Sequence, residues 1–300
     1  MKLPGSWRSP LDPERVMQVR MLHWQSNEQQ LREDHLTIEE PFEIRIANQS
    51  LAVIMRTPGN DYELAMGFLF TEGVIQSAAD VVQIEDALDA DGLPLENVVN
   101  VTLRSPESCD VAPASPTAFE RHFAVSASCG LCGKNSIAAL MQTTPPLEED
   151  TFRVSSAVLY QLATELRMQQ AVFTHTGGLH AAGLFTRHGQ LQLLREDVGR
   201  HNAVDKLIGH GLLHGTYPYN NYVMMVSGRT SFEIIQKALL ARIPCVAAIS
   251  APSSLAVELA DSSGITLVGF LRGNSMNVYS HPERVIANDA MDQEDEHAPL

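Results

Sequence analysis

The sequence predicts an α/β fold, and this prediction depends mainly on the last third of the chain. Three continuous apolar stretches, at residues 222–226, 244–249 and 265–270, predict buried strands. Helical patterns follow the first two of these stretches. Such alternation is typical of parallel βαβ units with right-handed crossovers. We therefore predict an α/β domain over residues 151–286, with a mixed, largely parallel sheet, and a smaller N-terminal lobe over residues 36–150.

Local patterns predict the parts of the N-terminal lobe. Apolar and polar side chains alternate on both sides of a polar turn, which indicates a β-hairpin. A helix should follow, because Asp61 suits an N-cap and Gly73 suits the end of a helix. In chain order we predict a polar, Gln-rich extension at residues 1–35, the hairpin at 42–55, the helix to about residue 72, a strand at 97–103 and a Pro- and acid-rich boundary near 143–150.

The same reasoning applies to the second domain. Asp197 is predicted to N-cap a helix that Gly209 ends. Continuous apolar strands lie on both sides of Gly- and Ser-rich loops further along. The predicted elements are a helix at 155–170, strands at 171–174, 180–186 and 190–195, the helix at 197–208, helices after the strands at 222–226 and 244–249 that end at Arg242 and near Ser263, and an acidic, disordered tail at 287–300.

Composition excludes several classes of function. The formal net charge of -15 argues against binding to nucleic acid or to an anionic membrane surface. The first residues lack the apolar core of a secretory signal, and no apolar run approaches the length of a membrane span. The four cysteines do not form the pattern of a disulfide framework. We expect a cytoplasmic protein in a reducing compartment, where a CxxC pair binds metal or performs redox or sulfur chemistry.

The pair Cys129 and Cys132 is the predicted reactive centre. Glycines flank both cysteines, Lys134 follows them, and a helical pattern begins at Asn135. A helix N-terminus and a nearby cation both lower the pKa of a thiol and so favour the nucleophilic thiolate. Cys109 and Cys245 are interpreted as bystanders.

Zinc is the alternative ligand for this thiol pair. A structural zinc site normally needs four ligands, commonly as two separated pairs, and this chain has a single CxxC. Zinc deaminases combine H-x-E with P-C-x-x-C, and neither part stands at a plausible position here. We therefore predict no metal of the protein's own and keep a zinc-stabilised scaffold as the alternative reading.

Three polar loops are predicted to lie at the carboxyl ends of the apolar strands, where open α/β sheets bind ligands. Arginines among small polar residues, with helix N-termini nearby, suit phosphate oxygens. The alternative is that the serines and threonines are caps and turn residues. No dinucleotide-binding or P-loop glycine motif occurs. The candidate ligand-binding residues in the first and third loops are Ser227, Gly228, Arg229, Thr230, Phe270, Leu271, Arg272, Gly273, Asn274 and Ser275.

Two further stretches are dense in polar side chains. Residues 196–202 carry Asp197, Arg200 and His201, which either face a ligand or form an ordinary helix start. Residues 174–180 carry His175 and His180, which could act as acid or base near the thiols or bind a metal. Buried, hydrogen-bonded histidines are the alternative reading of the second stretch.

An ordered set of motifs resembles the formate dehydrogenase accessory sulfurtransferase family, of the FdhD/NarQ type. The resemblance covers roughly residues 36–285. The motifs are Thr57-Pro58-Gly59, Gly67-Phe68-Leu69-Phe70-Thr71-Glu72-Gly73, Cys129-Gly130-Leu131-Cys132-Gly133, Thr174-His175-Thr176-Gly177-Gly178-Leu179-His180-Ala181-Ala182, Arg195-Glu196-Asp197-Val198-Gly199-Arg200-His201-Asn202-Ala203-Val204-Asp205-Lys206 and Ser227-Gly228-Arg229-Thr230-Ser231-Phe232-Glu233.

This resemblance implies a cytoplasmic, homodimeric sulfur carrier with a three-layer α/β/α fold like that of cytidine deaminases. The carrier would take sulfur from a cysteine desulfurase as a persulfide on Cys129, with Cys132 as second thiol. It would pass that sulfur to the bis-molybdopterin guanine dinucleotide form of the molybdenum cofactor (Mo-bis-MGD) before the cofactor enters formate dehydrogenase. The family's cofactor-binding segment corresponds to residues 270–275. A cofactor chaperone without sulfur chemistry is the alternative, and a deaminase is a more distant one.

Overall fold

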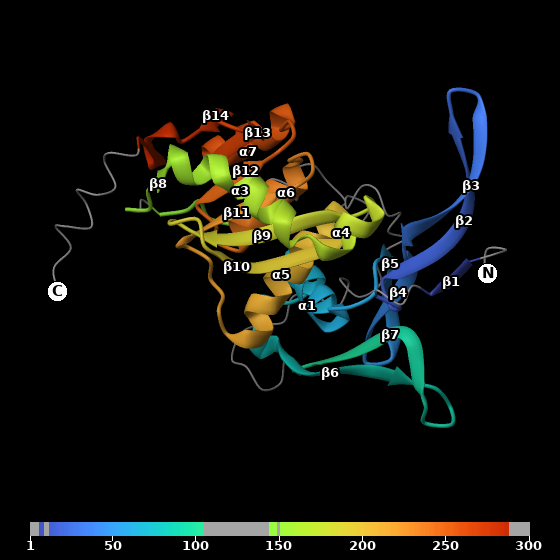
Figure 1. Cartoon of the computed structure of the whole chain (residues 1–300). Helices are drawn as coiled ribbons and strands as arrows, with labels where there is room; N and C mark the ends of the chain where they lie inside the picture. Colours follow the sequence, from blue (N-terminus) through green and yellow to red (C-terminus); the bar gives the residue numbers. More distant parts are fainter. Residues whose placement is uncertain (1–5, 9–11, 105–143, 149–150, 288–300) are drawn as a thin grey trace.

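The computed structural model describes residues 6–8, 12–104, 144–148 and 151–287 (Figure 1). The thiol pair and the acidic tail after residue 287 therefore lie outside the described residues. In the described part no helix has both the length and the apolar character needed to cross a bilayer.

A six-stranded mixed sheet forms the centre of the fold, in the order β10-β9-β11-β12-β13-β14. The pairs β11–β12 and β12–β13 are parallel, as the sequence predicts, and the other three pairs are antiparallel. The strands are β9 (His180–Thr186), β10 (Leu191–Asp197), β11 (Tyr222–Val226), β12 (Cys245–Ala248), β13 (Thr266–Arg272) and β14 (Ser275–Ser280).

Helices cover both faces of this sheet. Successive strand residues point to opposite sides, so each face presents side chains to a layer of helices. Val223 and Met225 pack in one cluster with α3 (Ser156–Gln169), whereas Met224 and Val226 pack in another with the helices of the opposite face. Those helices are α5 (Arg200–His214), α6 (Phe232–Leu240) and α7 (Ser254–Ser262). The three-layer α/β/α arrangement is thus confirmed.

The N-terminal part adds a second sheet and a helix to the same core. Its four strands lie in the order β5-β4-β7-β6, and α1 (Asp61–Thr71) packs on α5. Residues of α1, α5 and both sheets belong to one hydrophobic cluster. The predicted hairpin and helix are both present, but the helix is N-capped by Asn60 rather than by Asp61. The strands are β4 (Glu40–Ile46), β5 (Gln49–Arg56), β6 (Val81–Leu88) and β7 (Pro94–Leu103).

The first residues are more ordered than the sequence suggests. Where the sequence predicts a loose extension, β2 (Val16–Gln25) and β3 (Glu28–Thr37) form a long antiparallel hairpin that projects from the body (Figure 1). β1 (Ser6–Arg8) pairs with β2. When neither face of a two-stranded ribbon is buried, its side chains are polar on both sides. The sequence then lacks the apolar alternation from which strands are predicted.

Residues 171–174 are helical, so the predicted strand there is wrong. They belong to α4 (Ala171–Thr176). The carboxylate of Glu196 accepts hydrogen bonds from the backbone N–H groups of Val172 (3.3 Å) and Phe173 (3.0 Å). These are donors that the first turn of a helix leaves free. A distant side chain thus overrides the local preference of an apolar, β-branched stretch.

Helix α5 continues beyond the predicted stop at Gly209 and begins after Gly199 rather than Asp197. A Cβ atom at Gly209 would lie 1.8 Å from the carbonyl oxygen of Glu63, and one at Gly67 would lie 1.9 Å from that of Asp205. Both glycines therefore serve the close crossing of α1 and α5, and Gly209 is not a helix end.

The boundary predicted near residues 143–150 lies against the α/β domain where it is described. Arg242 donates hydrogen bonds to the carbonyl groups of Pro145 and Pro146, and the N–H of Leu147 donates to Ser263 O. The division into domains stays a prediction. Short elements complete the fold: 3-10 turns at Ala78–Asp80 and Pro282–Arg284, and the parallel pair β8 (Val154–Ser155) with β15 (Val285–Ile286).

Candidate functional site

Backbone hydrogen bonds join the three predicted loops at the carboxyl edge of β11, β12 and β13. Thr230 N donates to Ala251 O (3.2 Å), and Ser253 N donates to Thr230 O (3.0 Å). Phe270 N donates to Ser250 O (3.2 Å). The loops at 227–231 and 249–253 and the end of the β13–β14 hairpin at 270–275 thus form one surface, which we call the loop cluster.

The start of β9 lies beside this loop cluster. Ala181 N donates to Ser227 Oγ (2.9 Å), and Ser227 N donates to Ala181 O (3.0 Å). A Cβ atom at Gly228 would lie 3.2 Å from Nδ1 of His180 and 3.6 Å from Cδ of Arg200. The absence of a side chain at Gly228 therefore lets His180 and Arg200 approach the first loop.

The first turn of α5 brings His201 to the same place. Its Nε2 lies 3.3 Å from Ser231 Oγ and 3.5 Å from a carboxylate oxygen of Glu233. Ser231 Oγ also donates to Glu233 (2.7 Å). Burial opposes ionisation of Glu233, but hydrogen bonds from His201 and Ser231 outweigh it and lower the pKa of this carboxyl group to about 2.

Positive charge accumulates around His180. Burial lowers the pKa of His180, and the charges of Arg200 and His201 lower it further, against the opposing effect of Asp197. Two buried donors there have no hydrogen-bond partner among the described residues: Nε of Arg200 and Oγ1 of Thr230. Thr230 is only 1% exposed, and a buried donor without a partner is costly unless a ligand satisfies it. Chemically, the loop cluster suits an anionic ligand.

Comparison with known proteins places the chain in a family. The model of the FdhD/NarQ family matches residues 37–286. The chain belongs to the FdhD/NarQ family. A protein named sulfur carrier protein FdhD from Streptomyces coelicolor is 48% identical over 87% of this chain and 93% of its own length. One of the same name from Sulfurisphaera tokodaii is 45% identical over 90% of this chain and 99% of its own length.

A solved structure supports this FdhD/NarQ assignment. It is the crystal structure of a protein assigned as a formate dehydrogenase accessory protein from Desulfotalea psychrophila. The TM-score is 0.68 and the identity is 25%, over 91% of this chain and all of that one. The resemblance seen in the motifs of the sequence is thus confirmed, and so is the mixed α/β fold.

The structure places most of the predicted residues of this FdhD/NarQ chain in the loop cluster, but not Asp197. That carboxylate is fully buried. It accepts hydrogen bonds from Gly199 N (2.8 Å) and Asn202 Nδ2 (2.8 Å), and it pairs with Lys206 Nζ (2.7 Å). Asp197 therefore fixes the turn that presents Arg200, instead of facing a ligand itself.

Leu271 and His175 also differ from the prediction. Leu271 is fully buried in the cluster under α3, so it belongs to the core. His175 is exposed on α4, with its ring 6.4 Å from that of His35 on β3, and none of its described contacts reaches the loop cluster. Besides His175, the exposed members of the predicted set are Arg229, Phe270, Arg272, Gly273, Asn274 and Ser275.

The cysteines divide into two groups. Cys129, Cys132 and Cys109 lie outside the described residues. Cys245 is fully buried in β12, and burial raises the pKa of its thiol to about 12. It is therefore protonated at neutral pH and shielded from reagents, in agreement with the bystander role predicted for it.

Sequence reasoning missed Ser231 and Glu233 as partners of His201. Ser231 is the N-cap residue of α6 and Glu233 lies in the first turn, positions where serine and acidic residues are common for helix stability alone. It named Thr57 only as part of a family motif and did not anticipate that its backbone N–H donates to Asp197 (3.2 Å) or that its hydroxyl accepts from Val198 N (3.2 Å). No local pattern links residues so distant in the sequence.

Proposed function

We propose that this chain is a sulfur carrier and acts as a sulfurtransferase. In this proposal Cys129 accepts sulfur from a cysteine desulfurase as a persulfide. The sulfur then passes to Mo-bis-MGD before that cofactor enters formate dehydrogenase. The observation that carries the proposal is the CxxC pair in a chain 48% identical to a protein named sulfur carrier protein FdhD. A homodimer in the cytoplasm is the expected setting.

The sulfur transfer is a thiol–disulfide exchange. The Cys129 thiolate attacks the terminal sulfur of the desulfurase persulfide, so a new S–S bond forms on Cys129 and the desulfurase cysteine leaves as a thiolate. For release, the Cys132 thiolate attacks the inner sulfur of the Cys129 persulfide. This forms a Cys129–Cys132 disulfide and frees the terminal sulfur as hydrosulfide for the cofactor. An external dithiol reductant then restores both thiols.

The loop cluster is the proposed binding surface for the cargo. The guanine nucleotide ends of Mo-bis-MGD carry phosphates, which need cationic and hydrogen-bond donors. Arg200, Arg229 and Arg272 supply guanidinium groups on the described surface, and the unpartnered hydroxyl of Thr230 supplies a further donor. In this arrangement Asp197 and Glu233 position the α5 start and do not touch the cargo.

Mass spectrometry tests the sulfur-transfer step. The tag-free protein is incubated with a cysteine desulfurase and cysteine, digested without reductant and mapped. We expect the peptide with Cys129 to gain the mass of one sulfur atom, and a Cys129→Ser variant to lose that label. Cys109→Ser is the matched control and should keep it. A Cys129→Ser protein that still activates formate dehydrogenase fully would overturn the proposal.

The same variants separate the alternative functions. A chaperone without sulfur chemistry predicts that a Cys129→Ser, Cys132→Ser double variant keeps cofactor binding and full activation of formate dehydrogenase. A zinc scaffold predicts one zinc ion per chain that is lost in this double variant. The sulfur-carrier proposal predicts the loss of activation with cofactor binding retained.

A further inference from the structure

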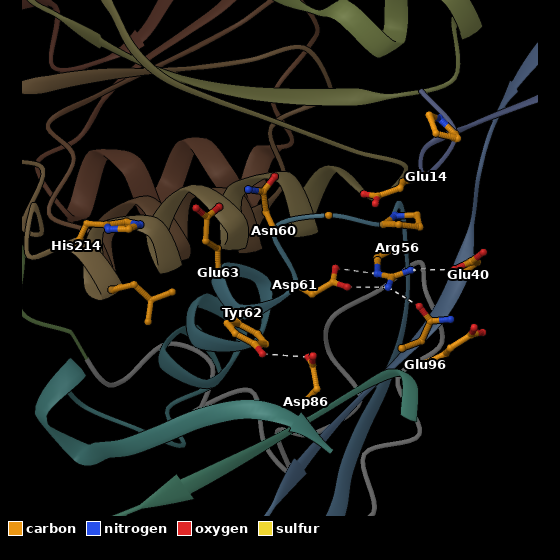
Figure 2. A pocket seen from close by; sticks show the side chains of 15 residues that line it. Glu14, Glu40, Arg56, Asn60, Asp61, Tyr62, Glu63, Asp86, Glu96 and His214 are labelled. Atoms are coloured by element: carbon orange, nitrogen blue, oxygen red, sulfur yellow. Dashed lines mark hydrogen bonds and ion pairs between the residues drawn. The ribbon is translucent and has the colours of Figure 1, made fainter. Parts of the chain in front are cut away.

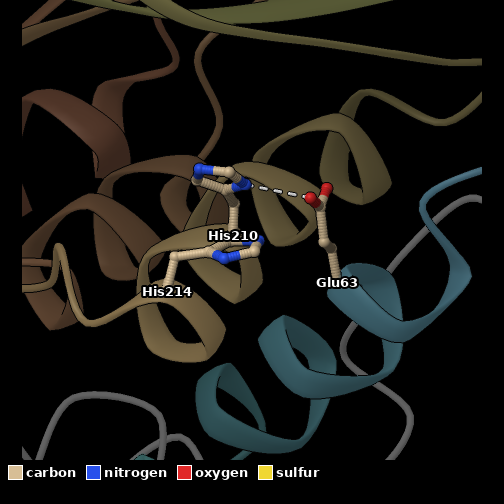
Figure 3. A group of neighbouring side chains, drawn as sticks. All are labelled: Glu63, His210 and His214. Atoms are coloured by element: carbon tan, nitrogen blue, oxygen red, sulfur yellow. Dashed lines mark hydrogen bonds and ion pairs between the residues drawn. The ribbon is translucent and has the colours of Figure 1, made fainter.

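Three metal-binding side chains come together where α1 crosses the last turns of α5. Glu63 lies in the first turn of α1, and His210 and His214 lie one helical turn apart on α5 (Figure 3). One potential ligand atom from each residue lies within 4.8 Å of the other two. Nδ1 of His210 is 3.0 Å from Oε1 of Glu63, and the two imidazole rings are 4.2 Å apart between centroids.

We propose that Glu63, His210 and His214 form a binding site for a divalent transition-metal ion, with zinc as the expected occupant. Two imidazoles and one carboxylate form a known zinc ligand set, and histidines at i and i+4 on a helix present both nitrogens to the same side. Ligand atoms around tetrahedral zinc lie about 3.3 Å apart, given bond lengths of about 2.0–2.2 Å. The three ligand atoms, which lie within 4.8 Å of one another, must close to that spacing when the ion binds.

The backbone under these side chains is held rigidly. The carbonyl group of Glu63 lies directly against Gly209, where even a Cβ atom would approach within 1.8 Å. His210 is the next residue along α5. The separation between the backbones of the carboxylate and the first histidine is therefore fixed by helix packing, which preorganises the site.

Arg195 orients the carboxylate of Glu63. Its guanidinium donates to Glu63 through Nε and through Nη2 (2.7 Å), and the same Nη2 lies 3.0 Å from Nδ1 of His210, so an ion that binds to that nitrogen must displace this contact. Metal-binding carboxylates are commonly hydrogen-bonded by a neighbouring group in this way. Side-chain exposure increases from Glu63 (10%) to His210 (26%), and His214 is exposed. An ion can therefore enter from solvent and keep a coordination position open.

The surroundings favour a cation despite the charge of Arg195. Glu63 and His214 line a cavity of about 870 Å³ between α1, α5 and the strands of the N-terminal sheet (Figure 2). Arg56 is the arginine among its lining residues and is bound by Asp61 (2.8 Å) and Glu40 (3.6 Å). The carboxylates that line the cavity are Glu14, Glu40, Asp61, Glu63, Asp86 and Glu96.

This site is separate from the loop cluster and from the proposed sulfur transfer. Arg200 and His214 stand at opposite ends of α5, a separation of about 20 Å at 1.5 Å per residue. An ion here would link the start of α1 to the end of α5, and thereby the N-terminal part to the α/β domain. The inference does not depend on the proposed function.

Zinc and cobalt titrations of the full-length, tag-free protein test the inference. Because the CxxC pair could also bind zinc, the titrations use the Cys129→Ser, Cys132→Ser background. We expect one zinc ion per chain by calorimetry, a higher thermal unfolding temperature with zinc, and a cobalt spectrum without thiolate-to-metal charge transfer.

Single variants in that background assign the ligands. His214→Gln changes an exposed residue, so the fold should be retained, as circular dichroism will check. We expect it to weaken zinc binding by at least about tenfold, the loss that even an outer-shell partner of a metal typically causes. His188→Gln, at an exposed histidine in the β9–β10 turn, is the matched control and should bind as before. No zinc binding in the Cys129→Ser, Cys132→Ser background, or equal affinity in His214→Gln, would overturn the proposal.

Discussion

At the scale of single residues, the charges around His180 describe the electrostatics of the loop cluster. Burial and the nearby charges of Arg200 and His201 lower the pKa of His180. The imidazole therefore resists protonation until an anion offsets those charges. The pKa of His180 is therefore a direct measure of the electrostatics of the proposed binding surface.

Removal of one charge should be visible at His180. We expect Arg200→Gln to raise the pKa of His180, because it removes a positive charge that opposes protonation. An NMR titration of the histidine Cε1 protons measures the change. Arg229→Gln is the control, since this exposed arginine is not among the charges that act on His180, and it should leave the titration unchanged. An unaltered or lowered pKa in Arg200→Gln would contradict the geometry of the cluster.

The lowered pKa of Glu233 predicts that the folded protein becomes less stable as the pH falls. Its pKa is about 2 in the folded protein against an ordinary value of 4.5, so its contribution is complete above pH 4.5 and is lost as the pH falls toward 2. Between pH 6 and pH 4 the contribution should fall by about 0.5 kcal/mol after solvent screening. Urea unfolding at both pH values should show a smaller loss of unfolding free energy in Glu233→Gln than in the unmodified protein. Glu258→Gln, on an exposed face of α7, should show the full loss.

At the scale of elements, α1 and α5 cross with their backbones in direct contact. Gly67 and Gly209 let the two backbones touch, with no room for a Cβ atom on either side. The same contact fixes Glu63 beside His210. The pair of helices thus connects the packing of the core with the proposed metal site.

Gly209→Ala should destabilise the protein, although alanine is normally the better helix former by about 1 kcal/mol. The added Cβ atom would meet the Glu63 carbonyl oxygen at 1.8 Å, so the helices must separate. We expect a loss of about 3 kcal/mol in the free energy of unfolding, measured with urea. The control Gly92→Ala, with a φ of +78° and no neighbour within 4 Å, should cost about 1 kcal/mol. Equal stability of Gly209→Ala and the unmodified protein would show that α1 and α5 lie further apart at this crossing than in the structure.

At the scale of the whole molecule, two lysines that form buried ion pairs within the α/β domain also donate hydrogen bonds to the N-terminal part. Lys237 on α6 contacts both carboxylate oxygens of Asp205 on α5 (2.6 and 2.7 Å) and the hydroxyl of Thr71 on α1 (2.8 Å). Lys206 on α5 reaches Thr57 O (2.9 Å) as well as Asp197. Both lysines are buried, and each connects the two parts through its hydrogen bond to a threonine of the N-terminal part.

Removing one partner of a buried ion pair should lower the free energy of unfolding more than replacing both partners with apolar residues. Lys237→Met leaves the carboxylate of Asp205 buried without its cation, and we expect a loss of about 3–5 kcal/mol in unfolding free energy. The double variant Lys237→Met, Asp205→Leu should recover much of that loss. A double-mutant cycle from urea unfolding gives the coupling energy. Additive single effects would mean that Lys237 and Asp205 do not stabilise the fold as a pair.

Much of the fold could be predicted from the sequence, because it depends on local periodicity. Continuous apolar runs identify β11, β12 and β13, and alternation identifies β4 and β5. The third loop at the sheet edge was also correctly placed, although it is the turn of a hairpin between β13 and β14. These features need only neighbouring residues to form.

The candidate site was predictable in part. The residue types at the sheet edge indicate an anion site, and the family motifs single out Arg200 and His201. Asp197 and Leu271 were assigned to the ligand because side-chain direction is set by packing. Asp197 turns inward to a lysine nine residues later, and Leu271 joins the core under α3. The sequence carries no signal for either orientation.

The sequence by itself determined the family and the order of the βαβ units, and it supplied the CxxC pair on which the proposed sulfur transfer depends. Only the tertiary structure decided that residues 171–176 are helical, that Gly209 lies within a helix, and that Glu63 meets histidines almost half the chain away. The physical reason is the same in each case. A carboxylate, a carbonyl group or an imidazole from a distant segment supplies the contact, and such contacts exist only after the chain has packed.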